Sequence, residues 1–304
     1  MTEKTNEEAI RVLIVHYHLN DPWPIRYGVY VWNLLMGDWG YSRSLSLPVL
    51  DALASRFPAT LELSIAGIIW ALVVGIPFGI ISALRNNKLP DHASRLVALT
   101  GVSTPVFWLG LLLQLLFFYY LHMLGLPNLP SNGRLDTTLS VEHPVVRITG
   151  LLVVDSLITG NFLATEDALA HLVLPSFALG FVSLGVIMRI MRSSMLEVLR
   201  QDYIILARSK GLSERVVIYR HALKNAMIPT VTVTGLAIAA LLGGAPLTET
   251  VFGWPGMGRL AVDAIGRNDA PLIMGFTLIA ALILVLVNLC VDVLYAYLDP
   301  RIKY

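Results

Sequence analysis

Residues that commonly carry covalent chemistry are scattered along this sequence. It has one cysteine, Cys290, inside an apolar run, and seven histidines with no i, i+4 pair among them: His16, His18, His92, His122, His143, His171 and His221. It contains no G-x4-G-K-S/T, G-x-S-x-G, H-E-x-x-H or C-x-x-C motif, so the sequence offers none of the common nucleotide, serine-nucleophile or metal motifs. His16 and His18 stand two residues apart in a stretch expected to be helical, which points them away from each other. The sequence predicts no catalytic residue and no metal site.

The most unusual charged stretch is ARSKGLSERVVIYRHALKNAMIP, residues 207–229, which lies between two apolar runs. Gly211 is expected to end one short helix in the left-handed conformation, and Ser213 to cap a second one. Along the second helix an apolar stripe recurs at three- and four-residue spacing, flanked by cations. The stripe is Val216, Tyr219, Leu223 and Ala226, and the flanking cations are Arg215, Arg220 and Lys224. Such a helix can rest on anionic lipid or dock into a groove of a soluble partner, and the residues alone do not choose.

The composition indicates that a lipid bilayer surrounds most of the chain. Of the 304 residues, 56% are hydrophobic and 14% are charged, whereas an ordinary soluble domain has about 25% charged residues. A bilayer core about 30 Å thick needs about 20 apolar residues in a helix. Five runs meet this length: residues 60–84, 96–124, 172–191, 227–247 and 271–298. The predicted fold is therefore an all-α, multi-pass membrane protein with five spans, and Pro77 and Pro105 are expected to kink their helices.

The distribution of Lys and Arg predicts the orientation. Eight of them lie between Arg189 and Lys224, which places this region and the C-terminus in the cytoplasm by the positive-inside rule. Residues 1–57 then form an external segment, and residues 58–304 form the transmembrane domain, in which 125–170 is an external loop. The start MTEKTNEEAI has no apolar stretch that could export an external segment, so a preceding transmembrane helix is expected to be missing from this chain.

Several motifs resemble those of one family, the dipeptide, oligopeptide and nickel permeases of ATP-binding-cassette (ABC) importers. DYIILARSKGLSERVVIYRHALKNAMIP, residues 202–229, is similar to the cytoplasmic "EAA" loop of these subunits. The resemblance continues through GDWGYS (37–42), RFPATLEL (56–63), TPVFWLGLLL (104–113), TETVFGWPGMGRL (248–260) and LDPRI (298–302). The family's first transmembrane helix is expected to be missing from this chain. The resemblance implies the transmembrane fold of a type I ABC importer.

The resemblance also implies a function and a set of partners. It implies a permease subunit that moves small peptides, or nickel- or oligosaccharide-type solutes, across the inner (cytoplasmic) membrane of a prokaryote. Two cytoplasmic ATPase subunits would use ATP and Mg²⁺, while this chain binds no cofactor. A second, homologous permease, an external or periplasmic substrate-binding protein and membrane lipid are the other implied partners, and nucleic acid is not among them.

Within this resemblance, the loop at residues 200–226 is a coupling loop seated in a groove of the ATPase. Small residues would allow close approach, cations would meet acidic groups at the groove's rim, and Pro229 would mark the start of the next span. His221 is expected to pack within the turn. The implied coupling residues are Asp202, Tyr203, Ala207, Arg208, Lys210, Gly211, Arg215, Arg220, His221 and Pro229.

Polar side chains inside the apolar runs are candidates for a substrate pathway, since such groups are costly in lipid. They are Thr230, Thr234, Gln114 and Asn288, although each could instead bridge or pack between helices. Trp254, in the turn-rich loop FGWPGMGRL, could gate the pore mouth or anchor the loop at headgroup depth. Asp292 is expected near the inner end of the last run.

Two other classes of protein would use these residues differently. A secondary transporter driven by an ion gradient needs broken helices in inverted repeats and buried ionisable groups, and this pattern is not found in the five runs. An intramembrane enzyme needs a clustered nucleophile and base or metal ligands within the spans. The importer is the predicted function, with the secondary transporter as the alternative.

Overall fold

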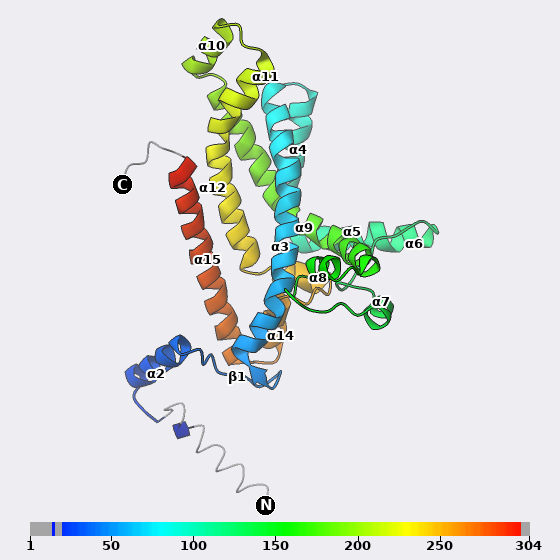
Figure 1. The fold of residues 1–304 in the computed structure, drawn as a ribbon, viewed down its shortest axis with the longest axis vertical. Helices are drawn as coiled ribbons and strands as arrows, with labels where there is room; N and C mark the ends of the chain where they lie inside the picture. Colours follow the sequence, from blue (N-terminus) through cyan, green and yellow to red (C-terminus); the bar gives the residue numbers. More distant parts are fainter. Residues whose placement is uncertain (1–13, 16–19, 299–304) are drawn as a thin grey trace, which may run out of the picture.

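The computed structural model describes residues 14–15 and 20–298 of the chain. Long helices run roughly side by side along the long axis of the molecule (Figure 1). They are α3 (Val49–Leu84), α9 (Phe162–Val198), α12 (Leu223–Leu242) and α15 (Ala270–Leu298). Within the described residues, five helical stretches are long and apolar enough to cross a membrane: Val49–Leu84, Val106–Met123, Phe162–Val198, Glu214–Leu242 and Ala270–Val291. The predicted all-α architecture with five spans is confirmed.

Shorter elements connect these helices. At the end where the chain begins are α2 (Trp23–Leu35) and a two-stranded antiparallel sheet of β1 (Tyr41–Ser42) and β2 (Leu47–Pro48). The remaining short helices are α4 (Leu89–Ser103), α5 (Val106–Leu113), η1 (Gln114–Tyr120), α6 (Leu121–Met123), α7 (Thr137–Glu142), α8 (Leu152–Ile158), α10 (Asp202–Ser209), α11 (Glu214–Val216), η2 (Val217–Ala222), α13 (Pro246–Val251) and α14 (Met257–Gly266). Both η1 and η2 are π-helical. Within the predicted external loop, residues 145–160 contain only the seven-residue α8, which is too short to cross a membrane.

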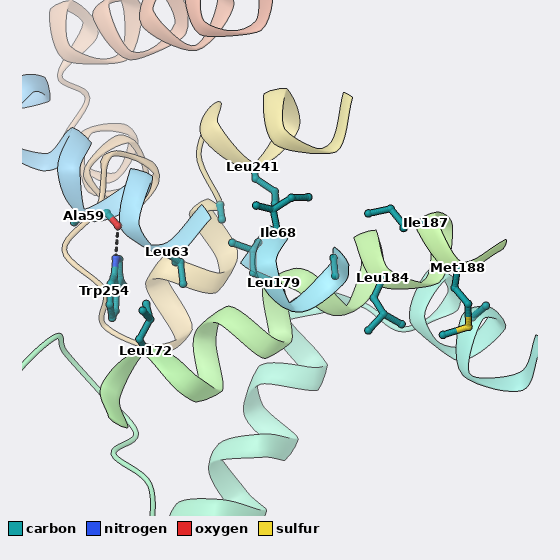
Figure 2. Close-up of a cluster of buried hydrophobic side chains, with 13 residues drawn as sticks. Ala59, Leu63, Ile68, Leu172, Leu179, Leu184, Ile187, Met188, Leu241 and Trp254 are labelled. Carbon is teal, nitrogen blue, oxygen red and sulfur yellow. Dashed lines mark hydrogen bonds between the residues drawn. The ribbon is translucent and has the colours of Figure 1, made fainter. Parts of the chain in front are cut away.

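Helices α3 and α9 form the centre of the bundle. Leu63 and Ile68 of α3 belong to the same buried cluster as Leu179 and Ile187 of α9 (Figure 2). At Gly180 the two backbones approach so closely that a β-carbon would overlap the carbonyl of Gly67. Small residues allow this distance between helices, which gains van der Waals contact where lipid offers no hydrophobic driving force.

The second predicted span, residues 96–124, is wrong as a single helix. Helix α4 ends at Ser103, and α5 begins at Val106 and turns away from the bundle axis (Figure 1). Pro105 disfavours helical geometry at the residue before it, and Thr104 is extended with ψ 124°. Proline here breaks the helix completely, where only a kink was expected.

Two other boundaries also differ from the predicted ones. The fourth run was expected to reach residue 247, but α12 ends at Leu242, and Gly243 and Gly244 lead into α13. Gly244 has φ +104°, a conformation that an L-residue rarely adopts. The first span begins earlier than expected, because α3 starts at Val49 and continues through Pro58 and Pro77 as one helix, across the predicted domain boundary at residues 57–58.

Candidate functional site

The basic segment forms a bent pair of helices at one end of the bundle, here called the elbow (residues 202–222). Helix α10 is followed by a turn at Gly211, and then by α11 and η2, which lead directly into α12 (Figure 1). Gly211 has φ +77°, so the prediction that it divides two short helices in the left-handed conformation is confirmed. A β-carbon there would meet nothing within 4 Å. Glycine is therefore required by the backbone conformation of the turn and not by a close contact within this chain.

The second short helix is not capped as the sequence suggested. Ser213 occupies the N-cap position of α11, but its side chain makes no capping hydrogen bond. Glu214, in the first turn, instead accepts a hydrogen bond from Arg208 Nε at 2.8 Å. This exposed ion pair joins the two arms of the elbow across the glycine turn.

One side of the elbow is packed against the body of this chain. Four of its apolar residues, together with Ala226 of α12, join a buried cluster with Ile80 and Ala83 of α3 and with Met191 and Met195 of α9. The four are Ile204, Ala207, Val217 and Ala222. Ala207 was predicted to allow close approach of a partner, and this is wrong because the residue is buried against its own chain. The elbow is therefore fixed to the two central helices.

The other side of the elbow is open. Val216 and Tyr219 are exposed, Tyr219 with 62% of its surface accessible, and Arg215 and Arg220 are exposed beside them. The predicted stripe is wrong in its second half, because Ala226 is buried in this chain and Leu223 packs against the same cluster. The π-helical η2 changes the angular register between residues 216 and 223, so a stripe drawn at 3.6 residues per turn is split between two faces.

The other predicted coupling residues are placed as follows. Asp202 and Lys210 are exposed, and the hydroxyl of Tyr203 accepts a hydrogen bond from Asn225 Nδ2 at 2.7 Å. His221 is half-buried, and its packing role stays a prediction. Pro229 was expected to mark the start of a span, but it lies inside α12, which begins at Leu223.

A buried ion pair lies close to the elbow at the same end of the bundle. The carboxylate of Asp91, in α4, accepts hydrogen bonds from Arg192 Nε of α9 at 2.7 Å and from Ser82 Oγ of α3 at 2.6 Å. The backbone N–H of Asn87 donates a third at 2.8 Å. The hydrogen bond from Arg192 is the largest of the effects that hold the pKa of Asp91 well below its usual range. These contacts join α3, α4 and α9 beside the helices on which the elbow rests.

Most of the predicted pathway residues make contacts within the bundle. Gln114 Nε2 donates to the carbonyls of Ser131 at 2.7 Å and Val251 at 3.0 Å, so it bridges segments. Thr230 is buried, and Thr234 Oγ1 donates to the Thr230 carbonyl at 2.8 Å. Asn288 is half-buried, and its Oδ1 has no hydrogen-bond partner within the described residues. A pathway role for Thr230, Thr234, Gln114 and Asn288 stays a prediction.

Trp254 lies in the packed core at the end of the bundle opposite to the elbow. It is 1% exposed, and its Nε1 donates to the carbonyl of Ala59 at 2.8 Å (Figure 2). The guanidinium of Arg134 lies 5.5 Å from the centre of the indole ring and donates a hydrogen bond to Glu62. The headgroup-anchor alternative is therefore wrong, and in this structure Trp254 fixes its loop to α3. A gating or pathway role for Trp254 stays a prediction.

Sequence reasoning missed Glu249, which organises the same loop. Its carboxylate is fully buried and accepts hydrogen bonds from Thr60 Oγ1 and from the backbone N–H of Arg259, both at 2.8 Å. Burial is the main reason why the pKa of Glu249 is raised. The available signal was an isolated acidic residue just before the glycine-rich stretch FGWPGMG. A buried carboxylate needs hydrogen-bond donors, and glycine lets backbone N–H groups come close enough to supply them.

In the part of the chain that the structure describes, no cluster of three or more His, Cys, Asp or Glu residues could hold a metal ion. His16 and His18 lie outside the described residues, and so does the greater part of the LDPRI motif. The side chain of Asp292 is also outside them.

Membrane-crossing helices with an open basic elbow at one end suit a permease, which passes a solute through the membrane unchanged. The family model for the binding-protein-dependent transport system inner membrane component matches residues 75–304. The chain belongs to this family. Its relatives are transport permeases and not enzymes, which confirms the predicted absence of enzymatic activity.

Curated relatives cover nearly the whole chain. The dipeptide transport system permease protein DppB of Alkalihalophilus pseudofirmus is 45% identical over 302 residues, which are 99% of this chain and 88% of that protein. The probable D,D-dipeptide transport system permease protein DdpB of Escherichia coli is 46% identical over 284 residues, 93% of this chain and 81% of that protein.

The fold also matches a solved transporter. The alignment with a chain of the inward-facing MetNI methionine ABC transporter covers 82% of this chain and 97% of that chain, with a TM-score of 0.57 and 14% identity. This similarity and the family match confirm the predicted type I ABC importer fold.

Proposed function

We propose that this chain is a permease subunit of an ATP-driven importer for dipeptides or similarly short peptides. The names of the relatives, dipeptide transport system permeases at 45% and 42% identity, support the substrate class. The excess of Lys and Arg around the elbow supports a cytoplasmic location for the elbow and the C-terminus, in the inner membrane of a prokaryote.

The open face of the elbow is the observation that supports this proposal. We infer that this face docks into a groove on a cytoplasmic ATPase. Tyr219 and Val216 supply an apolar anchor, and Arg215, Arg220 and Lys210 supply cations for acidic groups at the rim. Figure 1 shows α10 projecting beyond the nearby ends of α3 and α4. A helix that rests on the lipid surface would not need this projection, so docking is favoured over lipid binding.

The packing of the elbow suggests how force would pass into the membrane. ATP and Mg²⁺ are used by two ATPase subunits, and closure of those subunits moves the docked elbow. Because Ala207, Val217 and Ala222 are buried against α3 and α9, this movement is transmitted to the two central helices. A second, homologous permease completes the pathway, and an external substrate-binding protein delivers the peptide. The inward- and outward-open states then alternate without covalent chemistry in this chain.

Co-purification and uptake test this role together. We expect the double variant Arg215→Glu, Arg220→Glu to lose the associated ATPase and ATP-dependent dipeptide uptake in vesicles. The matched control is Arg147→Glu with Arg267→Glu, which reverses two exposed charges elsewhere on the chain and should keep both.

Two outcomes would contradict the proposal. If the elbow variant retained the ATPase and transported at the control rate, docking through this face would be wrong. If both variants bound the ATPase but the elbow variant failed only in vesicles rich in anionic lipid, the elbow would be a lipid-binding helix instead.

A further inference from the structure

Helix α2 has an unusual surface for a helix attached to a membrane bundle. None of its residues is buried, and its exposed side chains include Trp23, Tyr27, Tyr30 and Trp32. It lies crosswise beside the start of α15, at the end of the bundle opposite to the elbow (Figure 1). Trp and Tyr concentrate where a membrane meets water, because their rings are apolar and carry a polar group. This placement suits a helix that lies along the membrane surface.

A pocket of about 640 Å³ opens between α2, the β1 region and the first turn of α15. Its volume is within the usual range of small-molecule sites, about 300–1,000 Å³. Aromatic rings dominate the lining, which includes Trp23, Tyr27, Tyr30, Trp39 and Tyr41. An occupant of this pocket would therefore meet a largely apolar surface.

The charged side chains that line the pocket indicate which kind of molecule could bind there. Arg26 from α2 and Arg43 from the β1–β2 turn also line the pocket, and no ion pair involves either guanidinium within the described residues. Asp38 lines the pocket too, and its Oδ1 already accepts a hydrogen bond from the backbone N–H of Gly40 at 3.0 Å. Among the described lining residues, two guanidinium groups and one carboxylate leave a net positive charge, which favours an anion, and guanidinium groups bind phosphate oxygens well.

The pocket borders the start of α15, a helix with many exposed apolar residues. Pro271 and Met274 of α15 form part of its wall, and Met274 is exposed. Farther along α15, exposed apolar residues follow: Leu282, Leu284, Val285, Leu286 and Leu289. An anionic group in the pocket could thus carry a long hydrocarbon chain along α15, parallel to the span.

We propose that this pocket binds a membrane phospholipid, with the phosphate between Arg26 and Arg43, the headgroup against the Trp and Tyr rings, and an acyl chain along α15. A short peptide could also offer a carboxylate to arginine. The position at the membrane surface and the exposed apolar residues along α15 favour the lipid, because a dipeptide has no group long enough to cover them.

The test uses the complete transporter complex purified in detergent, with bound lipid measured by native mass spectrometry during titration with dioleoyl phosphatidylglycerol. Arg26→Gln with Arg43→Gln should weaken lipid retention about tenfold or more, given the size of basic side-chain contributions at membrane surfaces. Arg26→Lys with Arg43→Lys should restore most of the retention, which separates loss of charge from misfolding. The matched control, Arg147→Gln with Arg267→Gln, removes two exposed charges outside the pocket and should retain lipid normally.

Competition experiments distinguish a bound lipid from a bound peptide or a free anion. A dipeptide or inorganic phosphate at millimolar concentration should not displace the lipid. Displacement by the dipeptide would make this a peptide site, and displacement by inorganic phosphate would make it a site for free anions; either result overturns the proposal. Equal lipid retention by the Gln pair and the matched control would overturn it as well.

Discussion

Replacing Asp91 with asparagine should destabilise the chain far more than its small change in shape suggests. The side chain is fully buried and receives hydrogen bonds from Arg192, Ser82 and the backbone N–H of Asn87. Asparagine keeps one oxygen but turns an N–H₂ group toward at least one of these donors. Breaking a buried pair costs about 3–5 kcal/mol. Because the Arg192 side chain keeps 21% of its exposure, water offsets part of this, and we expect a loss of about 2–3 kcal/mol.

The measurement is the free energy of unfolding in mixed micelles titrated with sodium dodecyl sulfate and followed by tryptophan fluorescence. Arg95→Gln is the control, since Arg95 lies 3.5 Å from the same carboxylate but is 46% exposed, and such pairs contribute at most about 1 kcal/mol. If Asp91→Asn cost no more than Arg95→Gln, the idea that this buried pair holds α3, α4 and α9 together would be refuted.

The effect of pH follows from the lowered pKa of Asp91. A carboxylate with a depressed folded-state pKa contributes its full stability above its unfolded pKa, about 3.9, and loses it as the pH falls through the lower folded value. The difference between wild type and Asp91→Asn should therefore be the same at pH 6 and pH 8. A difference that shrank between these two values would mean that the carboxylate is not held in its charged form.

Two further substitutions test the packing of the bundle. Gly180→Ala places a methyl group against the carbonyl of Gly67 and should lower the free energy of unfolding by about 1–3 kcal/mol. In the same titration Gly28→Ala in α2, where a β-carbon meets nothing within 4 Å, should cause no loss of stability, because alanine favours the helix more than glycine does. Trp254→Phe removes the hydrogen bond to the Ala59 carbonyl and should cost about 1–3 kcal/mol; protease cleavage of the loop at residues 252–260 should then become faster, and an unchanged rate would argue against an anchoring role.

The spans could be predicted from the sequence because length and apolar character are local properties of a run. The turn at Gly211 was predictable for the same reason, since glycine is required where φ is positive. The break at Thr104 was harder to predict, because a proline in a membrane helix is compatible with a kink as well as with a full stop.

What could not be predicted depends on partners far away in the chain. Trp254 was expected either to gate the pore mouth or to anchor its loop at headgroup depth, whereas its indole is buried and donates a hydrogen bond to the carbonyl of Ala59, 195 residues away in sequence. The contact between Glu62 and Arg134 is likewise long-range. The prediction of which elbow residues share a face was wrong for a local reason. The π-helical η2 has no clear signature in the sequence VIYRHA.

The π-helical η2 absorbs one extra residue between the elbow and the span below it. A π-helical turn holds about one residue more than an α-helical turn. Removing one residue between positions 217 and 222 would therefore restore ordinary winding and leave the elbow and α12 in nearly the same relative orientation. A single-residue change of length at this place can thus be accommodated without redirecting the elbow.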